Sequence, residues 1–94
     1  MNIAVHDNPA ARRFEATVEG VTAYIDYRLV DGALVLVHTE VPAALEGRGV
    51  GGALVRAALE AAQAKGLPVV PVCPFVTAYI RRHPEFAKLV RARA

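Results

Sequence analysis

The stretch Val41–Val55, VPAALEGRGVGGALV, decides how this chain is interpreted, because it holds four of the seven glycines within six positions. The glycines run directly into ALVRAALEAAQAKG (53–66), an Ala-rich segment with helical spacing, in which Arg56, Glu60 and Gln63 form one polar stripe. Glycine costs a helix about 1 kcal/mol relative to alanine. Helix stability therefore does not explain why four glycines occur where this helix begins.

Upstream of this stretch, the sequence predicts three antiparallel strands. Polar and apolar residues alternate over 12–18 and again over 21–29, which is the pattern of half-buried strands. Asp31-Gly32 is a strong two-residue hairpin signal, since both turn positions favour positive φ. The third segment, ALVLVHTEV (33–41), begins as a continuous apolar run, so we expect a central strand covered on both sides.

Downstream, the sequence predicts a crossover and two short helices. LPVVPVC (67–73) is predicted as a strand parallel to 33–41, because a helix connects the two. Pro74 suits a first helical position, and Pro84 makes His83 a break between two helical segments. The expected fold class is α+β (α/β), one domain over 1–94. It comprises a compact mixed sheet with three antiparallel strands, then a helix, a parallel strand and short C-terminal helices.

Composition excludes several classes of protein. The net charge of +2 is mild, and the basic residues do not form the dense stripe of a nucleic-acid binder. No run of about 18 apolar residues is present, and residues 1–13 lack the order of a secretory signal, so we expect no membrane association. A single cysteine, Cys73, fits a reducing cytoplasm, and the separated histidines His6 and His83 predict no metal site.

A helix N-terminus offers unpaired N–H groups and partial positive charge, which favour a phosphate ligand. Glycines there let the backbone approach such a ligand closely. A flexible loop or close helix–sheet packing is the alternative. Gly47, Gly49 and Gly52 formally match G-x-G-x-x-G, but the preceding strands are antiparallel and the next strand ends in Cys73 rather than in an acid. A dinucleotide-binding fold is therefore rejected.

The segment HTEVPAALEGRGVGGALVRAAL (38–59) resembles the pyrophosphate-binding segment of the GNAT superfamily of acetyl-CoA-dependent N-acetyltransferases, whose signature is Gln/Arg-x-x-Gly-x-Gly/Ala. Gly49 and Gly51 fill the glycine positions of this signature. Glu46 stands where the signature has Gln or Arg, and Arg48 could supply the phosphate contact that is lost there. The chain as a whole resembles the small single-domain members of about a hundred residues. The resemblance implies that acetyl-CoA, or coenzyme A, lies where the glycine-bearing strand and the following parallel strand splay apart. Pro68 and Pro71, which cannot donate ladder hydrogen bonds, independently favour such an opening.

The resemblance also implies which residues hold the cofactor. The acetyl carbonyl would lie near the amide after Val41. The phosphates would rest on backbone N–H groups of a seven-residue segment: Glu46, Gly47, Arg48, Gly49, Val50, Gly51 and Gly52.

Four side chains are candidates for the chemistry. Cys73 precedes a helix start, which lowers a thiol pKa, so it could carry an acetyl group or form a mixed disulfide with CoA; a buried, inert cysteine is the alternative. Glu40, and secondarily His38, could serve as the general base for an amine, although His38 could also be a half-buried residue bridging the sheet. Tyr79 resembles the family tyrosine that protonates the CoA thiolate, and a core tyrosine is the alternative.

Two functions follow from these features. The first is an acetyl-CoA-binding N-acetyltransferase acting on an unidentified amine, such as one on a protein or peptide. The second is a CoA- or acyl-CoA-binding module without transfer activity, because Gly20 joins two strands directly and leaves no residues to wall an acceptor pocket. A partner chain could complete that wall, so a monomer or a homodimer is compatible with the sequence. A structural or nucleic-acid-binding protein would leave the glycines unexplained.

Overall fold

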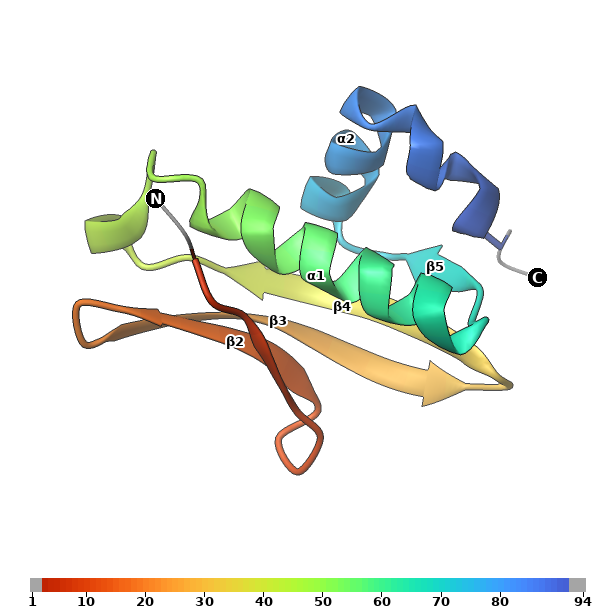
Figure 1. Cartoon of the computed structure of the whole chain (residues 1–94), viewed down its shortest axis with the longest axis horizontal. Coiled ribbons are helices and arrows are strands. Elements are labelled where there is room, and N and C mark those ends of the chain that lie inside the picture. Colours follow the sequence, from red (N-terminus) through yellow and green to blue (C-terminus); the bar gives the residue numbers. More distant parts are fainter. Residues whose placement is uncertain (1–2, 92–94) are drawn as a thin grey trace.

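In the computed structural model, which describes residues 3–91, five strands form one sheet in the order β1-β2-β3-β4-β5 (Figure 1). β1 to β4 are antiparallel, and β5 runs parallel to β4. The strands are β1 (His6–Asn8), β2 (Arg13–Val18), β3 (Val21–Val30), β4 (Ala33–Glu40) and β5 (Val69–Pro71). The helices are α1 (Val50–Lys65) and α2 (Pro74–Arg82), with the 3-10 segments η1 (Ala43–Leu45) and η2 (Pro84–Leu89).

The two hairpins and the crossover are as predicted. Asp31 and Gly32 both have positive φ, 50° and 75°, as the β3–β4 turn requires. The turn between β2 and β3 is built in the same way from Glu19 and Gly20, with φ of 52° and 78°. α2 has Pro74 at its first position and ends at Arg82, before His83, which confirms the predicted break.

Four expectations need correction. β1 was not predicted, because His6–Asn8 is a short polar edge segment without an apolar face. Its addition makes β3 the middle strand and leaves β4 second from the edge. α1 begins at Val50 rather than after the glycines, so Gly51 and Gly52 lie inside it. β5 is shorter than 67–73, because its pairing with β4 ends at Pro71.

The core lies between the sheet and α1. α1 packs against β2, β3 and β4, while α2 and η2 contact α1 (Figure 1). Leu54, Val55 and Leu59 of α1 are fully buried, as are Ile25 and Leu36 of the sheet. Because side chains alternate along a strand, this packing assigns the odd-numbered buried residues of β3 to the helical face. Burial of apolar surface on this single face is what holds the layers together.

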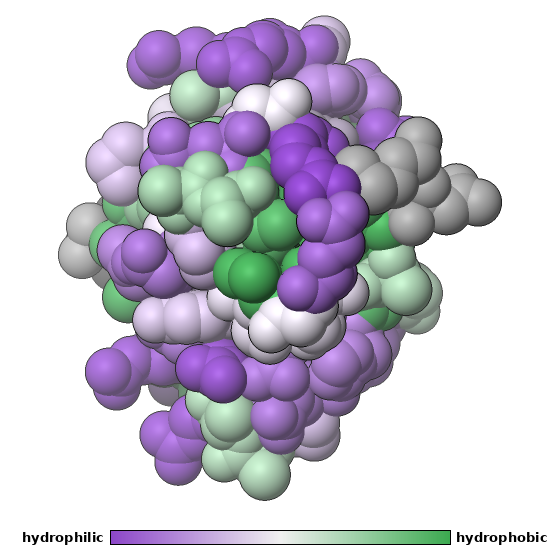
Figure 2. Space-filling model, turned by 90° about the vertical axis from the view of Figure 1, so that its left-hand side faces the viewer, coloured by the Kyte–Doolittle hydropathy of each residue, from purple (hydrophilic) through white to green (hydrophobic). Residues whose placement is uncertain are grey.

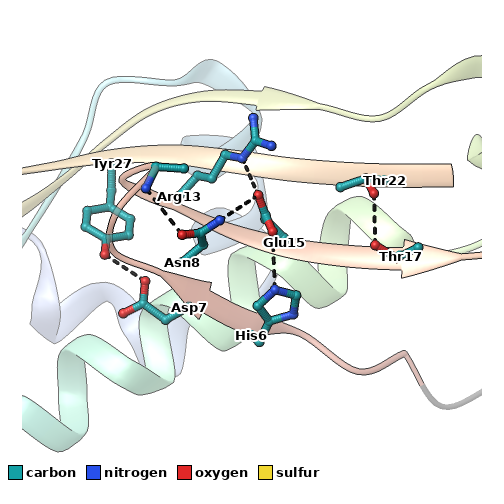
Figure 3. Close-up of polar contacts among 9 residues, drawn as sticks. His6, Asp7, Asn8, Arg13, Glu15, Thr17, Thr22 and Tyr27 are labelled. Atoms are coloured by element: carbon teal, nitrogen blue, oxygen red, sulfur yellow. Dashed lines mark hydrogen bonds and ion pairs between the residues drawn. The ribbon is translucent and has the colours of Figure 1, made fainter. Parts of the chain in front are cut away.

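Polar side chains occupy the opposite face of the sheet, and Figure 3 shows its β1 side. Glu15 is only 9% exposed, but its carboxylate pairs with Arg13, with His6 Nε2 at 3.2 Å and with Asn8 Nδ2 at 3.3 Å. The hydrogen bond from Arg13 is the main reason that the pKa of Glu15 is lowered. Across the strands, Glu15 stands opposite Tyr24, and Tyr24 stands opposite Glu40. Glu40 therefore belongs to this polar face.

β1 is tied to the centre of the sheet by a long-range hydrogen bond. The Tyr27 hydroxyl donates to Asp7 Oδ1 at 2.7 Å, as Figure 3 shows. Burial, together with this carboxylate, raises the pKa of Tyr27 to about 12. The tyrosine therefore remains a neutral donor throughout the physiological range, and the short edge strand keeps its anchor.

Candidate functional site

The N-terminus of α1 presents open backbone donors. Its N-cap, Gly49, has φ of 79°, and no side chain caps the helix. The first bond of the helix runs from the Ala53 N–H to the Gly49 carbonyl at 3.1 Å. The N–H groups of Val50, Gly51 and Gly52 precede that bond and therefore point out of the end of the helix. With the helix dipole, they form a place where an anion is stabilised.

The four glycines of this region serve different purposes. Gly47 and Gly49 have φ of 76° and 79°, a backbone conformation that glycine adopts without strain. Gly51 lies inside the helix, and a Cβ there would come within 2.8 Å of Phe75 Cζ. A Cβ at Gly52 would make ordinary contact with the Tyr79 ring at 3.6 Å. Gly51 is thus explained by a close neighbour from α2.

These residues line a hollow of about 220 Å³ between the start of α1 and the start of α2. Figure 2 faces this end of the molecule, where apolar side chains gather in a depression bordered by polar ones. Of the predicted cofactor-binding residues, all except Arg48 line it: Val41, Glu46, Gly47, Gly49, Val50, Gly51 and Gly52. Sequence reasoning missed two further lining residues, Leu45 and the 43%-exposed Phe75.

Arg48 reaches a partner elsewhere in the chain. Its Nη1 and Nη2 atoms each donate to one carboxylate oxygen of Glu19, both at 3.2 Å. Glu19 belongs to the β2–β3 turn, so the pair joins that hairpin to the glycine loop. The hydrogen bond from Arg48 is the main reason that the pKa of Glu19 is lowered.

β4 and β5 diverge beside the hollow. Their pairing ends at Leu36 opposite Pro71, whereas β4 continues along β3 as far as Glu40. At the same point, a bulge leaves Val37 unpaired with β3, because Asp26 pairs with His38 and Tyr27 with Leu36. The N–H groups of Val72 and Cys73 both donate to the Leu36 carbonyl at 3.0 Å, which turns the chain away into α2. The predicted opening is therefore present in the sheet.

Cys73 lies at this divergence as the N-cap residue of α2, buried and with a free thiol. Its Sγ is 3.6 Å from Thr39 Oγ1 on β4. Burial alone would raise the pKa of Cys73. Hydrogen bonds from Thr39 and from the backbone N–H groups of Phe75 and Val76 outweigh burial, and the pKa is lowered. Thr39 was missed in the sequence, because nothing in the pattern indicates which face of β4 meets Cys73.

His38 and Glu40 form a pair on the other face of β4. His38 Nε2 and Glu40 Oε1 are 3.1 Å apart, and both side chains are about half exposed. Since neighbouring residues in a strand point to opposite faces, Thr39 faces Cys73 while His38 and Glu40 face away. The partner of His38 thus belongs to its own strand, so this half-exposed histidine does not bridge the sheet.

Tyr79 is packed between α1 and η2. Its ring is 8% exposed and stacks on His83, with centroids 4.0 Å apart and planes inclined at 15°. The Tyr79 hydroxyl accepts a hydrogen bond from Arg56 Nη1 at 3.4 Å. Its ring also borders Gly52 in the first turn of α1. The structure thus places this tyrosine beside the start of α1, with its hydroxyl held by an arginine.

Among residues 3–91, no three or more His, Cys, Asp or Glu side chains are arranged to hold a metal ion. None of the helices in the same part of the chain has the length and apolarity needed to cross a membrane.

The Thr39 hydroxyl should control the ionisation of the single thiol. In Thr39→Val the thiolate loses a hydrogen-bond partner, so the pKa of Cys73 should rise above that of the wild type, in which it is lowered from the ordinary value of a cysteine. Thiolate absorbance at 240 nm against pH measures the midpoint, with Cys73→Ser as the blank for tyrosine ionisation. Thr17→Val is the matched control, because its hydroxyl pairs with Thr22. An unchanged midpoint in Thr39→Val would contradict this assignment.

Comparison with known proteins agrees with the geometry. The chain resembles the solution structure of a GCN5-like candidate N-acetyltransferase from Staphylococcus aureus, with a TM-score of 0.74 at 24% identity. The alignment covers 99% of this chain and 92% of that one, so the two share a fold. A model of the GCN5-related N-acetyltransferase family matches residues 13–89. The chain therefore belongs to the GCN5-related N-acetyltransferase family.

Proposed function

We propose that this protein binds acetyl-CoA at the start of α1 and transfers the acetyl group to an amine. One observation carries the proposal: the uncapped N-terminus of α1 opens into a hollow whose lining also includes Val41, the residue after β4, and Phe75, in the first turn of α2. An anionic group is stabilised by open N–H donors and the helix dipole. The neighbouring gap in the sheet leaves β4 from Val37 to Glu40 without β5 as a partner. An extended amide-containing arm could pair there.

The residues fit this ligand in two halves. The pyrophosphate would contact the backbone of residues 46–52, and the acetyl-bearing arm would follow β4 toward Thr39 and Cys73. Phe75, which lines the hollow and is 43% exposed, adds apolar surface for the ligand. No metal is needed in this arrangement. The single buried thiol fits a reducing compartment, so the cytoplasm remains the proposed location.

The transfer step requires a base and an acid. The amine nitrogen forms a bond to the acetyl carbon, the thioester C–S bond breaks, and CoA leaves as a thiolate. Glu40 would accept the proton that the amine loses, with His38 at 3.1 Å as its partner or substitute. Tyr79 or Cys73 would supply a proton to the thiolate. An amine would approach Glu40 from the open polar face of the sheet, which can admit a large acceptor.

A second candidate function is a CoA- or acyl-CoA-binding module that transfers nothing. The observation that favours it is the direct connection of β2 and β3 through Glu19 and Gly20, which leaves no segment there to enclose an acceptor. A second copy of the chain could supply that enclosure.

Binding is tested by calorimetric titration of acetyl-CoA with a pair of equally strained variants. Gly49→Ala and Gly66→Ala each place a Cβ in open space at positive φ, 79° and 67°, at opposite ends of α1. Each should lose about 1–2 kcal/mol of stability from the left-handed backbone. Only Gly49→Ala should weaken binding, by about tenfold or more, since its end of the helix meets the ligand. Equal effects of the two variants would contradict the site.

Transfer is tested by release of the CoA thiol in the presence of small amines and peptide N-termini. Glu40→Gln should lower the rate by about 10²–10⁴-fold while leaving acetyl-CoA affinity unchanged, because it removes only the base. Glu85→Gln, an exposed acid on η2, serves as the control. Binding without thiol release from the wild type would support the binding module and refute the transferase.

A further inference from the structure

Glu19 forms an ion pair with the one cationic side chain in the glycine loop, although 29 residues separate it from that loop in the sequence. The pairing is fork to fork: Nη1 to Oε1 and Nη2 to Oε2, each 3.2 Å. Glu19 has φ of 52° in the β2–β3 turn, and Arg48 lies between two glycines with positive φ. Both residues are therefore presented by tight backbone turns that face each other.

The pair is accessible to solvent. The Glu19 side chain is 72% exposed and that of Arg48 is 31% exposed. Exposed ion pairs contribute little to stability, because water solvates the separated charges well. Exchange of one carboxylate for another anion therefore costs little. The same two-oxygen geometry that Glu19 offers is also offered by a phosphate group.

The charges around the loop do not favour an anionic ligand while this pair is intact. Glu46 is exposed at the rim of the hollow, and Glu19 neutralises Arg48. Two carboxylates thus accompany one guanidinium beside the open end of α1. A ligand phosphate arriving there is attracted by the helix N-terminus and repelled by Glu19.

We propose that Glu19 is an internal competitor for the ligand phosphate, and that Arg48 exchanges the Glu19 carboxylate for a phosphate oxygen when the ligand binds. This inference rests on the proposed function, because it requires a phosphate-bearing ligand at the start of α1. Glu19 is then a specificity-determining residue outside the glycine segment. It lowers the affinity for the phosphate groups of the ligand and does not change the binding of the parts that carry no phosphate. If Glu19 instead held Arg48 in its productive position, its removal would have the opposite effect.

The test is a calorimetric titration of CoA at low ionic strength into the wild type, Glu19→Gln, Arg48→Gln and the double variant, with reductant present so that Cys73 cannot form a mixed disulfide. Glu19→Gln should bind CoA about three- to tenfold more tightly, because one negative charge near the phosphates is removed. The gain should shrink with added salt and be largely lost in the Arg48→Gln background. S-acetylpantetheine, which carries no phosphate, should bind Glu19→Gln and the wild type equally.

Two controls keep the outcomes distinct. Glu85→Gln removes an exposed carboxylate elsewhere and should leave CoA affinity unchanged. Glu19→Asn, a residue tolerated at positive φ, repeats the experiment if the glutamine variant folds poorly. Unchanged or weaker CoA binding by the Glu19 variants would overturn the inference while the proposed function stands. Absence of CoA binding by the wild type would refute the proposed function itself.

Discussion

The architecture of the site depends on where β4 and β5 stop pairing. The two parallel strands are held together only from Leu34 to Leu36, and the Leu36 carbonyl then accepts two N–H groups from the chain that leaves β5. That turn leads into α2, whose N-cap Cys73 contacts Thr39 of β4. The first turn of α1 in turn lies against Phe75 of α2. A helix N-terminus, a buried thiol and a length of β4 that pairs with β3 but not with β5 are thereby brought together. Longer pairing of β5 would close the gap between them.

The glycine segment connects this constraint to the proposed chemistry. Glycine at 47 and 49 permits the turn that leads into α1, and glycine at 51 permits Phe75 to lie against its first turn. The cost of glycine to a helix is therefore offset partly by the packing of α2 and partly, in our proposal, by the ligand. The family of the chain, the open helix end and the gap in the sheet support our proposal that the ligand is acetyl-CoA. For the acceptor amine, the structure offers one clue, which is the open polar face of the sheet that carries Glu40.

Local features of the fold were predictable, and long-range contacts were not. Alternation, the Asp31-Gly32 turn and the prolines at 74 and 84 act over a few residues, so sequence alone located the hairpins, α1 and the break at His83. β1 lacks an apolar face and is defined by long-range contacts, namely its pairing with β2 and the hydrogen bond from Tyr27 to Asp7. The partner of Arg48 comes from a turn 29 residues earlier, and the neighbour of Gly51 comes from α2. Alternation placed His38 and Glu40 on one face of β4 but could not show that Thr39 is the residue facing Cys73.

The most direct test of the proposed site is a titration of the ¹⁵N-labelled protein with CoA, followed by amide chemical shifts. We expect the largest shifts at the open end of α1 (50–52), along the part of β4 that lacks β5 as a neighbour (37–40) and at the start of α2 (73–76). The β3–β4 turn at Asp31-Gly32, at the far end of the sheet, should not shift. Shifts centred on that turn, or shifts absent from residues 50–52 in a protein that binds CoA, would contradict the site described here.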